Sequence, residues 1–318
     1  MSVENAEAGA GVLSEYAASA AARGGFDELV RPDAPRPDTD RLLSAIDALG
    51  PAGLLTARAD VRRLVAEDGI TYGAAPDGAQ GRLWSIDPIP LLIDGPAWSA
   101  LEAGLQQRAV LLRLLLDDLY GDMSLLRRRI IAPEMVLGHA GFIRAAHGIA
   151  SRLRPLVITA TDLGRGADGS WHVINDRTQA PSGAGYVMAT RRVVAKVLPR
   201  LRRSTGLAQL GAFFHTMTAA VQAAAPATGD VPRGVVLTPG AGSETAYDQA
   251  FTASLLGFPL VEADDLVMRE GKVWLRTNER YEQVDVILRR VDESWSDPLD
   301  LRGDSQLGVP GLIEATRQ

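Results

Sequence analysis

The most informative stretch of the chain is residues 155–186, whose sequence is PLVITATDLGRGADGSWHVINDRTQAPSGAGY. It contains two apolar runs of β type, Leu156–Thr161 and Trp171–Ile174. Between them lies Gly166-Ala167-Asp168-Gly169, whose glycines and aspartate are typical of a tight turn between antiparallel strands. The stretch therefore predicts a β-hairpin.

Folding this hairpin places polar side chains from both strands at one end of it. Asp162 then lies near the end of the first strand, roughly opposite Asn175 and Asp176. Carboxylate and amide oxygens are the ligands that a hard cation such as Mg²⁺ takes in proteins. Asp162, Asp176 and Asn175 are therefore candidate metal ligands. The alternative is that these acidic residues only end strands and solubilise turns, which is common.

A Gly- and Pro-rich segment follows the second strand and runs from Thr178 to Gly185. Small residues let backbone N–H groups approach phosphate oxygens, and the next expected helix would point its positive dipole end at them. The candidate cofactor-binding residues are Thr178, Ser182, Gly183 and Gly185. No Gly-Lys-Ser/Thr closes the segment, so it is not a Walker loop.

Four arginines are candidates for a catalytic role in gripping a phosphate or a carboxylate. Arg177 and Arg191 lie close in sequence to the hairpin and the Gly-rich segment. Arg289 and Arg290 end a run predicted as a buried strand, and ligands of open α/β sheets sit at strand carboxyl ends. A guanidinium can hold such groups through two parallel hydrogen bonds. The alternative for any one arginine is solvation at the surface, because nearly all basic residues of the chain are arginines.

Composition excludes several classes of protein. The 318 residues contain no Cys, which excludes disulfides, thiolate nucleophiles and Cys-ligated zinc. A net charge of −6 gives no electrostatic footprint for nucleic acid or for a membrane surface. The N-terminus lacks the basic and apolar regions of a secretory signal, and no apolar stretch is long enough to span a bilayer. We therefore expect a soluble, cytoplasmic protein.

The chain divides into three parts by composition and periodicity. Residues 1–36 are rich in Ala, Gly and Pro and are predicted to form a loosely ordered arm. Residues 37–225 combine helical segments with the hairpin and carry the candidate metal and phosphate site. Residues 233–318 are predicted to form a small α/β unit. Spacing and capping signals predict a long helix that Asp94 caps and that runs through Leu119, and further helices at Asp40–Leu49, Pro51–Glu67, Pro133 to about Arg152, Tyr186–Leu201 and Leu207–Ala225.

The last part has the order strand, loop, helix, strand, hairpin, strand. Its predicted buried strands are Gly234–Leu237, Phe258–Val261 and Val284–Leu288, with a helix at Glu244–Leu256. This order implies a mainly parallel sheet. The Gly-rich turn Pro239–Ser243 could bind an anionic group at the helix N-terminus, although a tight turn alone also explains it.

Several runs together resemble the circularly permuted ATP-grasp family, type 2. The likeness covers the chain from about residue 40 to its last residue. The runs that carry it are the hairpin with Asp162, Asp176–Tyr186, Leu237–Gly240, Ile287–Asp292 and Asp304–Leu312, with Trp84–Pro90 and Asp117–Gly121 also similar.

This resemblance implies a mixed α/β (α+β) fold, in which a permuted ATP-grasp-like part joins a small Rossmann-like unit and the ATP-grasp fold is incomplete. It implies ATP and Mg²⁺ as cofactors of a ligase that activates a carboxylate as an acyl phosphate, which an amine then displaces. The substrates would be small-molecule or peptide carboxylates and amines. By similarity, Asp162 falls on the family's strand aspartate, and residues 175–177 fall on its Glu-x-Asn metal motif.

The chain also departs from the family pattern. Asn175 and Arg177 stand where the family has Glu and Asn, which leaves Asp176 as the nearest carboxylate. The family's nucleotide-binding subdomain, with the lysines that neutralise phosphates, would follow residue 318 in permuted order. Neither Lys196 nor Lys272 has a suitable strand context. These departures motivate a rival hypothesis, a non-catalytic module, truncated or degenerate, that binds a peptide or a partner protein.

Overall fold

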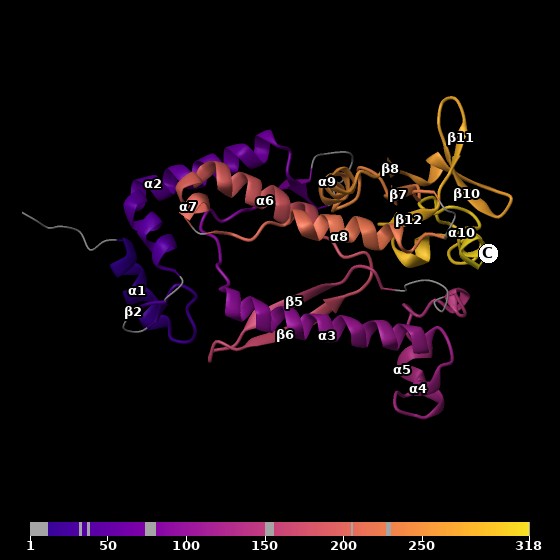
Figure 1. Ribbon diagram of the computed structural model, residues 1–318, viewed down its shortest axis with the longest axis horizontal. Helices are drawn as coiled ribbons and strands as arrows, with labels where there is room; N and C mark the ends of the chain where they lie inside the picture. Colours follow the sequence, from indigo (N-terminus) through magenta and orange to yellow (C-terminus); the bar gives the residue numbers. More distant parts are fainter. Residues whose placement is uncertain are drawn as a thin grey trace, which may run out of the picture.

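A computed structural model describes residues 12–31, 34–36, 39–73, 81–149, 156–204, 206–226 and 230–317. The described chain forms two layers (Figure 1). One layer holds the helices of residues 40–67 and 184–256 together with the sheets of the C-terminal part, and the other holds the long helix of residues 95–119 with the hairpin of residues 160–177. The prediction of a mixed α/β (α+β) fold is confirmed. Among the described residues, no helix has both the length and the apolarity to cross a membrane.

The N-terminal segment contains regular structure where a loosely ordered arm was expected. Helix α1 spans Val12–Arg23, and the two-residue strands β1 (Val30–Arg31) and β2 (Ala34–Pro35) pair antiparallel. The physical reason is burial, since Leu13 and Leu29 pack against a core cluster that includes Leu42 of the next helix. Residues 1–11 of the expected arm lie outside the described chain.

Helix α2 spans Asp40–Glu67 and contains both helices predicted there. Gly50 interrupts it with a non-helical φ of 61°, and Pro51 starts the second half. The strands β3 (Thr71–Tyr72) and β4 (Arg82–Leu83) then pair antiparallel.

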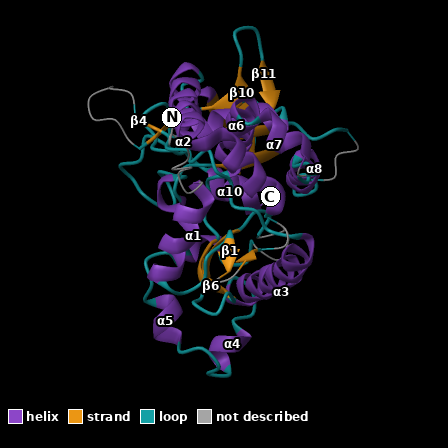
Figure 2. Cartoon of the chain, turned by 90° about the vertical axis from the view of Figure 1, so that its left-hand side faces the viewer, coloured by secondary structure: helices purple, strands orange, loops and turns teal. Residues whose placement is uncertain are grey.

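Helix α3 spans Gly95–Leu119 and begins as the sequence predicts. The Asp94 carboxylate accepts from the backbone N–H of Ala97 at 2.7 Å and so caps the helix. The strands β5 (Ala160–Arg165) and β6 (Trp171–Arg177) run beside α3, as both ribbon views show (Figures 1 and 2).

Two short helices follow α3, namely α4 (Ser124–Arg127) and α5 (Pro133–Leu137). The helix predicted from Pro133 to about Arg152 is wrong in length, because α5 ends at Leu137 and only a short 3-10 turn, Arg144–Ala146, follows among residues 138–149. Residues 150–155 lie outside the described chain.

The next three helices are α6 (Ala184–Val197), α7 (Pro199–Ser204) and α8 (Gly211–Gln222). One helix was predicted where α6 and α7 stand, and the break falls at Leu198, directly before Pro199. Buried side chains of α6 and of the second half of α2 share one core cluster, which includes Val61, Val65 and Val193. This packing fixes the start of α6 within the fold.

A three-stranded parallel sheet forms the centre of the C-terminal part. Its order is β12-β7-β8, with β7 at Gly234–Leu237, β8 at Leu260–Val261 and β12 at Val286–Arg289. Helix α9 (Ala246–Leu256) connects β7 to β8, as predicted. The connection after β7 leads through α9 to β8 on one side of β7, while β12 pairs with β7 on its other side. The carboxyl ends of β7 and β12 therefore form a topological switch point.

A second sheet of three antiparallel strands follows, in the order β11-β10-β9. Its strands are β9 (Leu266–Arg269), β10 (Lys272–Arg276) and β11 (Tyr281–Gln283), and the final helix α10 spans Leu312–Arg317. Residues from both sheets, including Val235, Leu237 and Val273, share one buried cluster, so the two sheets belong to one core.

Candidate functional site

The β5–β6 hairpin forms as predicted. Asp162 pairs with Asn175 across the two strands, and Thr161 pairs with Asp176. At the other end, the Asp168 carboxylate accepts from the N–H of Ser170 at 3.0 Å and closes the turn. The register shifts once, next to Asp162 and Leu163, as in a β-bulge.

The pairing separates the two candidate metal carboxylates. Side chains alternate between the faces of a strand, and directly paired residues point to the same face. Asp162 and Asn175 therefore share one face of the hairpin, while Asp176 and Thr161 share the other. The structure does not bring Asp162 and Asp176 together.

Each of these carboxylates already has a cationic partner. Asp162 Oδ1 lies 2.7 Å from Nη2 of Arg177, on the same face of the hairpin. Asp176 Oδ2 lies 2.6 Å from Nε of Arg108 on α3, and Oδ1 accepts from the Thr161 hydroxyl at 3.0 Å. Asp176 thus ties the hairpin to α3, whereas Asp162 forms a partly exposed ion pair.

The donors fit a magnesium ion only in part. Over the described ranges, no three His, Cys, Asp or Glu side chains are grouped so that they could hold a metal. Magnesium is often bound by one or two carboxylates together with substrate phosphates and water. Asp162 with Asn175 satisfies that requirement on one face, and Asp176 cannot join them from the other.

The predicted phosphate cradle is filled by a side chain of the protein. Asp248, a residue of α9 that is 2% exposed, accepts from the N–H groups at the start of α6. Its Oδ1 lies 2.8 Å from N of Gly185 and 3.2 Å from N of Tyr186, and its Oδ2 lies 3.2 Å from N of Gly183. The Asp248 carboxylate occupies the positive end of the α6 dipole, where a phosphate would otherwise bind. The N–H groups of Gly183 and Gly185 are therefore engaged within the protein, and a phosphate would have to displace the Asp248 carboxylate to reach them.

The predicted arginines lie in different places. The guanidinium of Arg290 donates to the carbonyl of Pro181 at 2.8 Å and lies 3.9 Å from Asp248 Oδ2. The guanidinium of Arg289 donates to the carbonyl of Val291. Burial lowers the pKa of both side chains, and nearby acidic groups oppose that shift. Arg191 instead donates to the carbonyl of Ala208 at 2.5 Å.

Three segments that are far apart in the sequence converge on one cleft of about 630 Å³. They are the loop after β6, the loop between β7 and α9, and the loop after β12. The cleft therefore lies at the switch point of the parallel sheet, where ligands of open α/β sheets bind. Its polar lining residues are Gln179, Ser182, Ser243, Glu244, Thr245, Gln249, Arg290, Asp292, Glu293 and Ser294. Of the candidate site residues, Ser182 and Arg290 line it, whereas Thr178 does not.

Gln249 orders one wall of the cleft, although nothing in the sequence singled it out. It is 2% exposed and accepts from the hydroxyl of Thr238. Its amide donates to Ser243 at 3.0 Å and to Thr245 at 2.9 Å. Its burial, which creates the need for these partners, is visible only in the structure. The network holds the loop between β7 and α9 in one shape.

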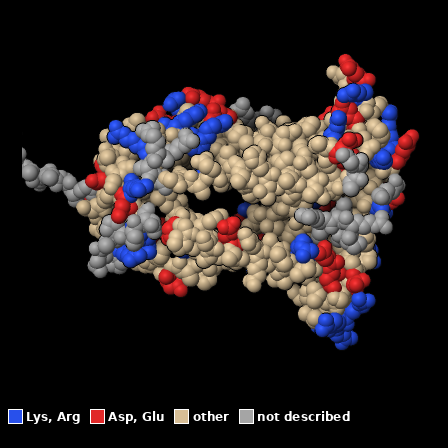
Figure 3. Space-filling view, in the orientation of Figure 1, with Lys and Arg blue, Asp and Glu red and all other residues tan. Residues whose placement is uncertain are grey.

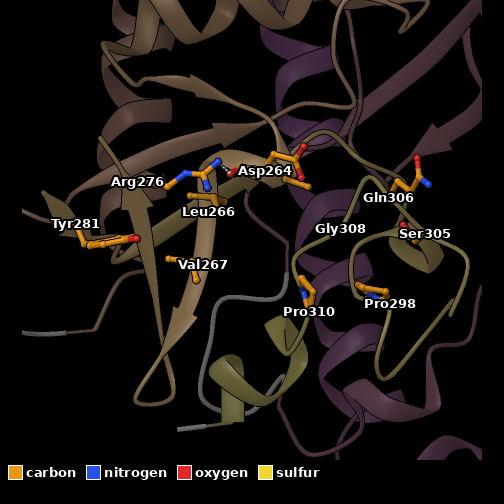
Figure 4. A pocket seen from close by; sticks show the side chains of 11 residues that line it. Asp264, Leu266, Val267, Arg276, Tyr281, Pro298, Ser305, Gln306, Gly308 and Pro310 are labelled. Atoms are coloured by element: carbon orange, nitrogen blue, oxygen red, sulfur yellow. Dashed lines mark hydrogen bonds between the residues drawn. The ribbon is translucent and has the colours of Figure 1, made fainter. Parts of the chain in front are cut away.

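A second hollow, of about 680 Å³, lies between the antiparallel sheet and the loop from Pro298 to Pro310 (Figure 4). On its sheet side, the Arg276 guanidinium donates to the carbonyl of Asp264 at 2.7 Å. On its loop side, the Ser305 hydroxyl donates to the carbonyl of Trp295 at 2.6 Å. None of the candidate site residues lines this hollow, so the cleft at the parallel sheet remains the candidate site.

Comparison with known proteins gives the family. The model of the circularly permuted ATP-grasp type 2 family matches residues 90–318. The chain belongs to this family. The matched region contains the hairpin, α6 and the whole parallel sheet, and so includes every element that lines the cleft of this ATP-grasp protein.

Several curated proteins are similar to this ATP-grasp chain. An uncharacterized protein of Mycobacterium tuberculosis is 47% identical over 303 residues, which is 92% of this chain and 34% of that protein. A second from the same species is 37% identical over 268 residues, covering 84% of this chain and 48% of that protein. An uncharacterized protein of Synechocystis sp. is 33% identical over 297 residues, covering 92% and 62%. The chain thus spans about one to two thirds of the length of these relatives.

Proposed function

We propose that the chain forms part of an ATP-grasp-type ligase that joins a carboxylate to an amine. The observation that carries this proposal is the cleft at the switch point of the parallel sheet, in a chain whose family generally uses ATP and Mg²⁺. In such a ligase the carboxylate is activated as an acyl phosphate, which the amine displaces. The substrates would be small-molecule or peptide carboxylates and amines.

The hairpin face with Asp162 and Asn175 is the proposed place for the magnesium ion. When bound there, the cation would neutralise the charge of the ATP phosphates. Asp162 would then have to exchange its ion pair with Arg177 for the cation, which frees a guanidinium beside the same face. Such a guanidinium is suited to hold a phosphate or carboxylate group through paired hydrogen bonds.

A second candidate function is a non-catalytic module that binds a peptide or a partner protein. Two observations favour it. Arginines pair with both carboxylates that were expected to hold magnesium, and Asp248 occupies the N–H groups at the start of α6. A chain that keeps these internal pairs would bind Mg-ATP weakly.

Calorimetry with ATP and Mg²⁺ separates the two functions. For the ligase we expect saturable Mg-ATP binding to the 318-residue protein, lost when EDTA removes the cation. Asp162→Asn should weaken that binding about tenfold, because it removes a charge-assisted contact of about 1.4 kcal/mol. Asp168→Asn is the matched control on the same hairpin, where an asparagine can keep the turn.

Two results would count against the ligase. Absence of Mg-ATP binding up to millimolar ATP would favour the non-catalytic module. Equal binding by the wild-type protein and Asp162→Asn would remove Asp162 from the metal site.

A further inference from the structure

The layer that contains α3 and the β5–β6 hairpin shares no buried core with the helical layer (α2, α6–α9 and the C-terminal sheets). The four buried hydrophobic clusters found among the described residues contain no residue of α3, β5 or β6. A two-stranded hairpin is only marginally stable by itself in water. The position of the hairpin relative to the helical layer therefore depends on individual contacts with other segments.

The N-terminal segment, from α1 to Arg36, is anchored in the helical layer. Leu13 of α1 and Leu29 pack against the buried cluster that includes Leu42 of α2. The backbone N–H of Arg36 donates to the carbonyl of Leu29 at 3.0 Å, next to the paired strands β1 and β2. Figure 1 shows α1 and β2 at the end of the molecule where α3 begins. The segment is thus fixed to one layer at the place where the other layer starts.

The same segment binds the turn end of the hairpin through Arg165, the last residue of β5. Arg165 Nε lies 3.0 Å from Oε1 of Glu28, and its Nη2 lies 3.2 Å from Oε2, so the ion pair has two parallel hydrogen bonds. Arg165 Cζ also lies 4.6 Å from the centre of the Phe26 ring and 3.9 Å from that of Trp171. Arg165 Nη1 donates to the carbonyl of Gly169 at 2.8 Å, which ties the same guanidinium to the turn.

The shapes of the two segments also match at this contact. The Phe26 ring lies so close to Gly169 that a Cβ at this position would overlap the ring. Gly169 has a φ of 85°, so the turn and the ring contact both require a residue without a side chain. The Arg165–Glu28 pair is partly buried, at 22% and 29% exposed, and it is reinforced by the cation–π contacts. The contact is therefore stronger than an isolated surface ion pair.

We propose that the N-terminal segment is a strap that positions the hairpin relative to the helical layer, and that Arg165 is its positioning residue. The inference rests on the proposed ligase function, in which Asp162 on the hairpin holds magnesium while the cleft with Arg290 lies in the helical layer. Groups bound at these two places react only when they are held close together. At its other end the hairpin continues through residues 178–183 into α6, so the strap fixes the end that the chain itself leaves untied.

A pair of spin labels measures the position of the hairpin. The chain has no Cys, so Ile174→Cys on β6 and Lys196→Cys on α6 supply the only two thiols, both at exposed positions. Double electron–electron resonance should give one narrow distribution of distances between the labels. Glu28→Gln or Phe26→Leu should add a second population and lower the ratio of strapped to released hairpins about tenfold, a typical effect of losing one charge-assisted contact.

Two further variants show whether the Arg165 contact is responsible. Glu15→Gln is the matched control and should leave the distribution narrow, because Glu15 is an exposed acid of the same segment outside the Arg165 contact. Glu28→Gln combined with Arg165→Gln should release the hairpin no more than Arg165→Gln alone, since both changes remove the same ion pair. Circular dichroism checks that each variant is folded. Unchanged distributions in Glu28→Gln and Phe26→Leu would overturn the proposal.

Calorimetry with Mg-ATP on the proteins without labels separates the strap from the ligase function. The apparent affinity should fall in proportion to the strapped fraction that the spin labels measure. Release of the hairpin in Glu28→Gln, with no Mg-ATP binding even by the wild-type protein, would support the strap and count against the ligase. Mg-ATP binding with unchanged label distances would support the ligase and refute the strap. Release of the hairpin with unchanged Mg-ATP affinity would refute the positioning role of Arg165.

Discussion

Replacement of Asp248 by alanine should destabilise the protein strongly. The 2%-exposed carboxylate accepts from the N–H groups of Gly183, Gly185 and Tyr186, at 3.2, 2.8 and 3.2 Å. Arg290 Nη2 lies 3.9 Å from the same carboxylate, and its side chain is 8% exposed. Asp248→Ala would leave these three N–H donors without their acceptor and would remove the carboxylate beside the buried Arg290 guanidinium, which still donates to the carbonyl of Pro181.

The structure allows the size of this effect to be estimated. Loss of a helix N-cap costs about 1 kcal/mol, and loss of one partner of a buried ion pair costs about 3–5 kcal/mol. The two terms overlap, since one carboxylate serves both roles, so we expect Asp248→Ala to lower the free energy of unfolding by about 4 kcal/mol. Asp248→Asn keeps one oxygen acceptor and should lose about 2 kcal/mol.

Urea denaturation followed by tryptophan fluorescence measures this loss. Trp84 stacks on Tyr186 of α6 with ring centroids 4.3 Å apart, so its emission reports on the helix that Asp248 caps. Asp300→Ala, at an exposed position, is the control and should change stability by less than about 0.5 kcal/mol. If Asp248→Ala lost no more stability than this control, the assignment of Asp248 as the anchor of α6 would be refuted.

Two further predictions concern other carboxylates. The fully buried Asp297 accepts from the N–H groups of Leu299, Gly311 and Ile313 at 2.8, 3.1 and 2.9 Å. Asp297→Ala should therefore lower the free energy of unfolding by about 3 kcal/mol and speed proteolysis near α10. Equal cleavage rates of the variant and the wild-type protein would contradict this. Hydrogen bonds from the Ser124 hydroxyl and from the backbone N–H of Leu125 lower the pKa of Asp118. The contribution of Asp118 to stability is therefore complete above the ordinary Asp pKa of about 3.9, and it is lost as the pH falls through the lowered pKa. Asp118→Asn should flatten the acid limb of stability against pH, and an unchanged acid limb would show that these bonds do not matter.

The local parts of the fold could be predicted from the sequence. The turn residues around Asp168 predict the hairpin, and the Asp94 cap predicts the start of α3. Strand β7 lies where its apolar run predicts. Such features depend on neighbours in the chain, and turn chemistry and capping groups encode them directly.

The site depended on contacts that local patterns do not encode. Asp248 is 63 residues from Gly185 in sequence, and no spacing rule connects an acidic residue of one helix with the start of another. The sequence of the Gly-rich loop is therefore typical of an anion-binding site, because it does not show that the Asp248 carboxylate occupies the N–H groups. The separation of Asp162 from Asp176 depends on the β-bulge, because the register of the turn half, continued without a shift, would pair Asp162 with Ile174 and place Asp162 and Asp176 on the same face.

The β-bulge divides the hairpin into two halves that make different contacts. Arg165, on the turn side of the bulge, binds Glu28 of the N-terminal segment at 3.0 Å, while Asp162 and Arg177 lie on the loop side. The register shift lies between the half that contacts the N-terminal segment and the half that carries the Asp162–Arg177 pair, so the two halves make separate contacts. Figure 3 shows the opening between the two layers of the chain.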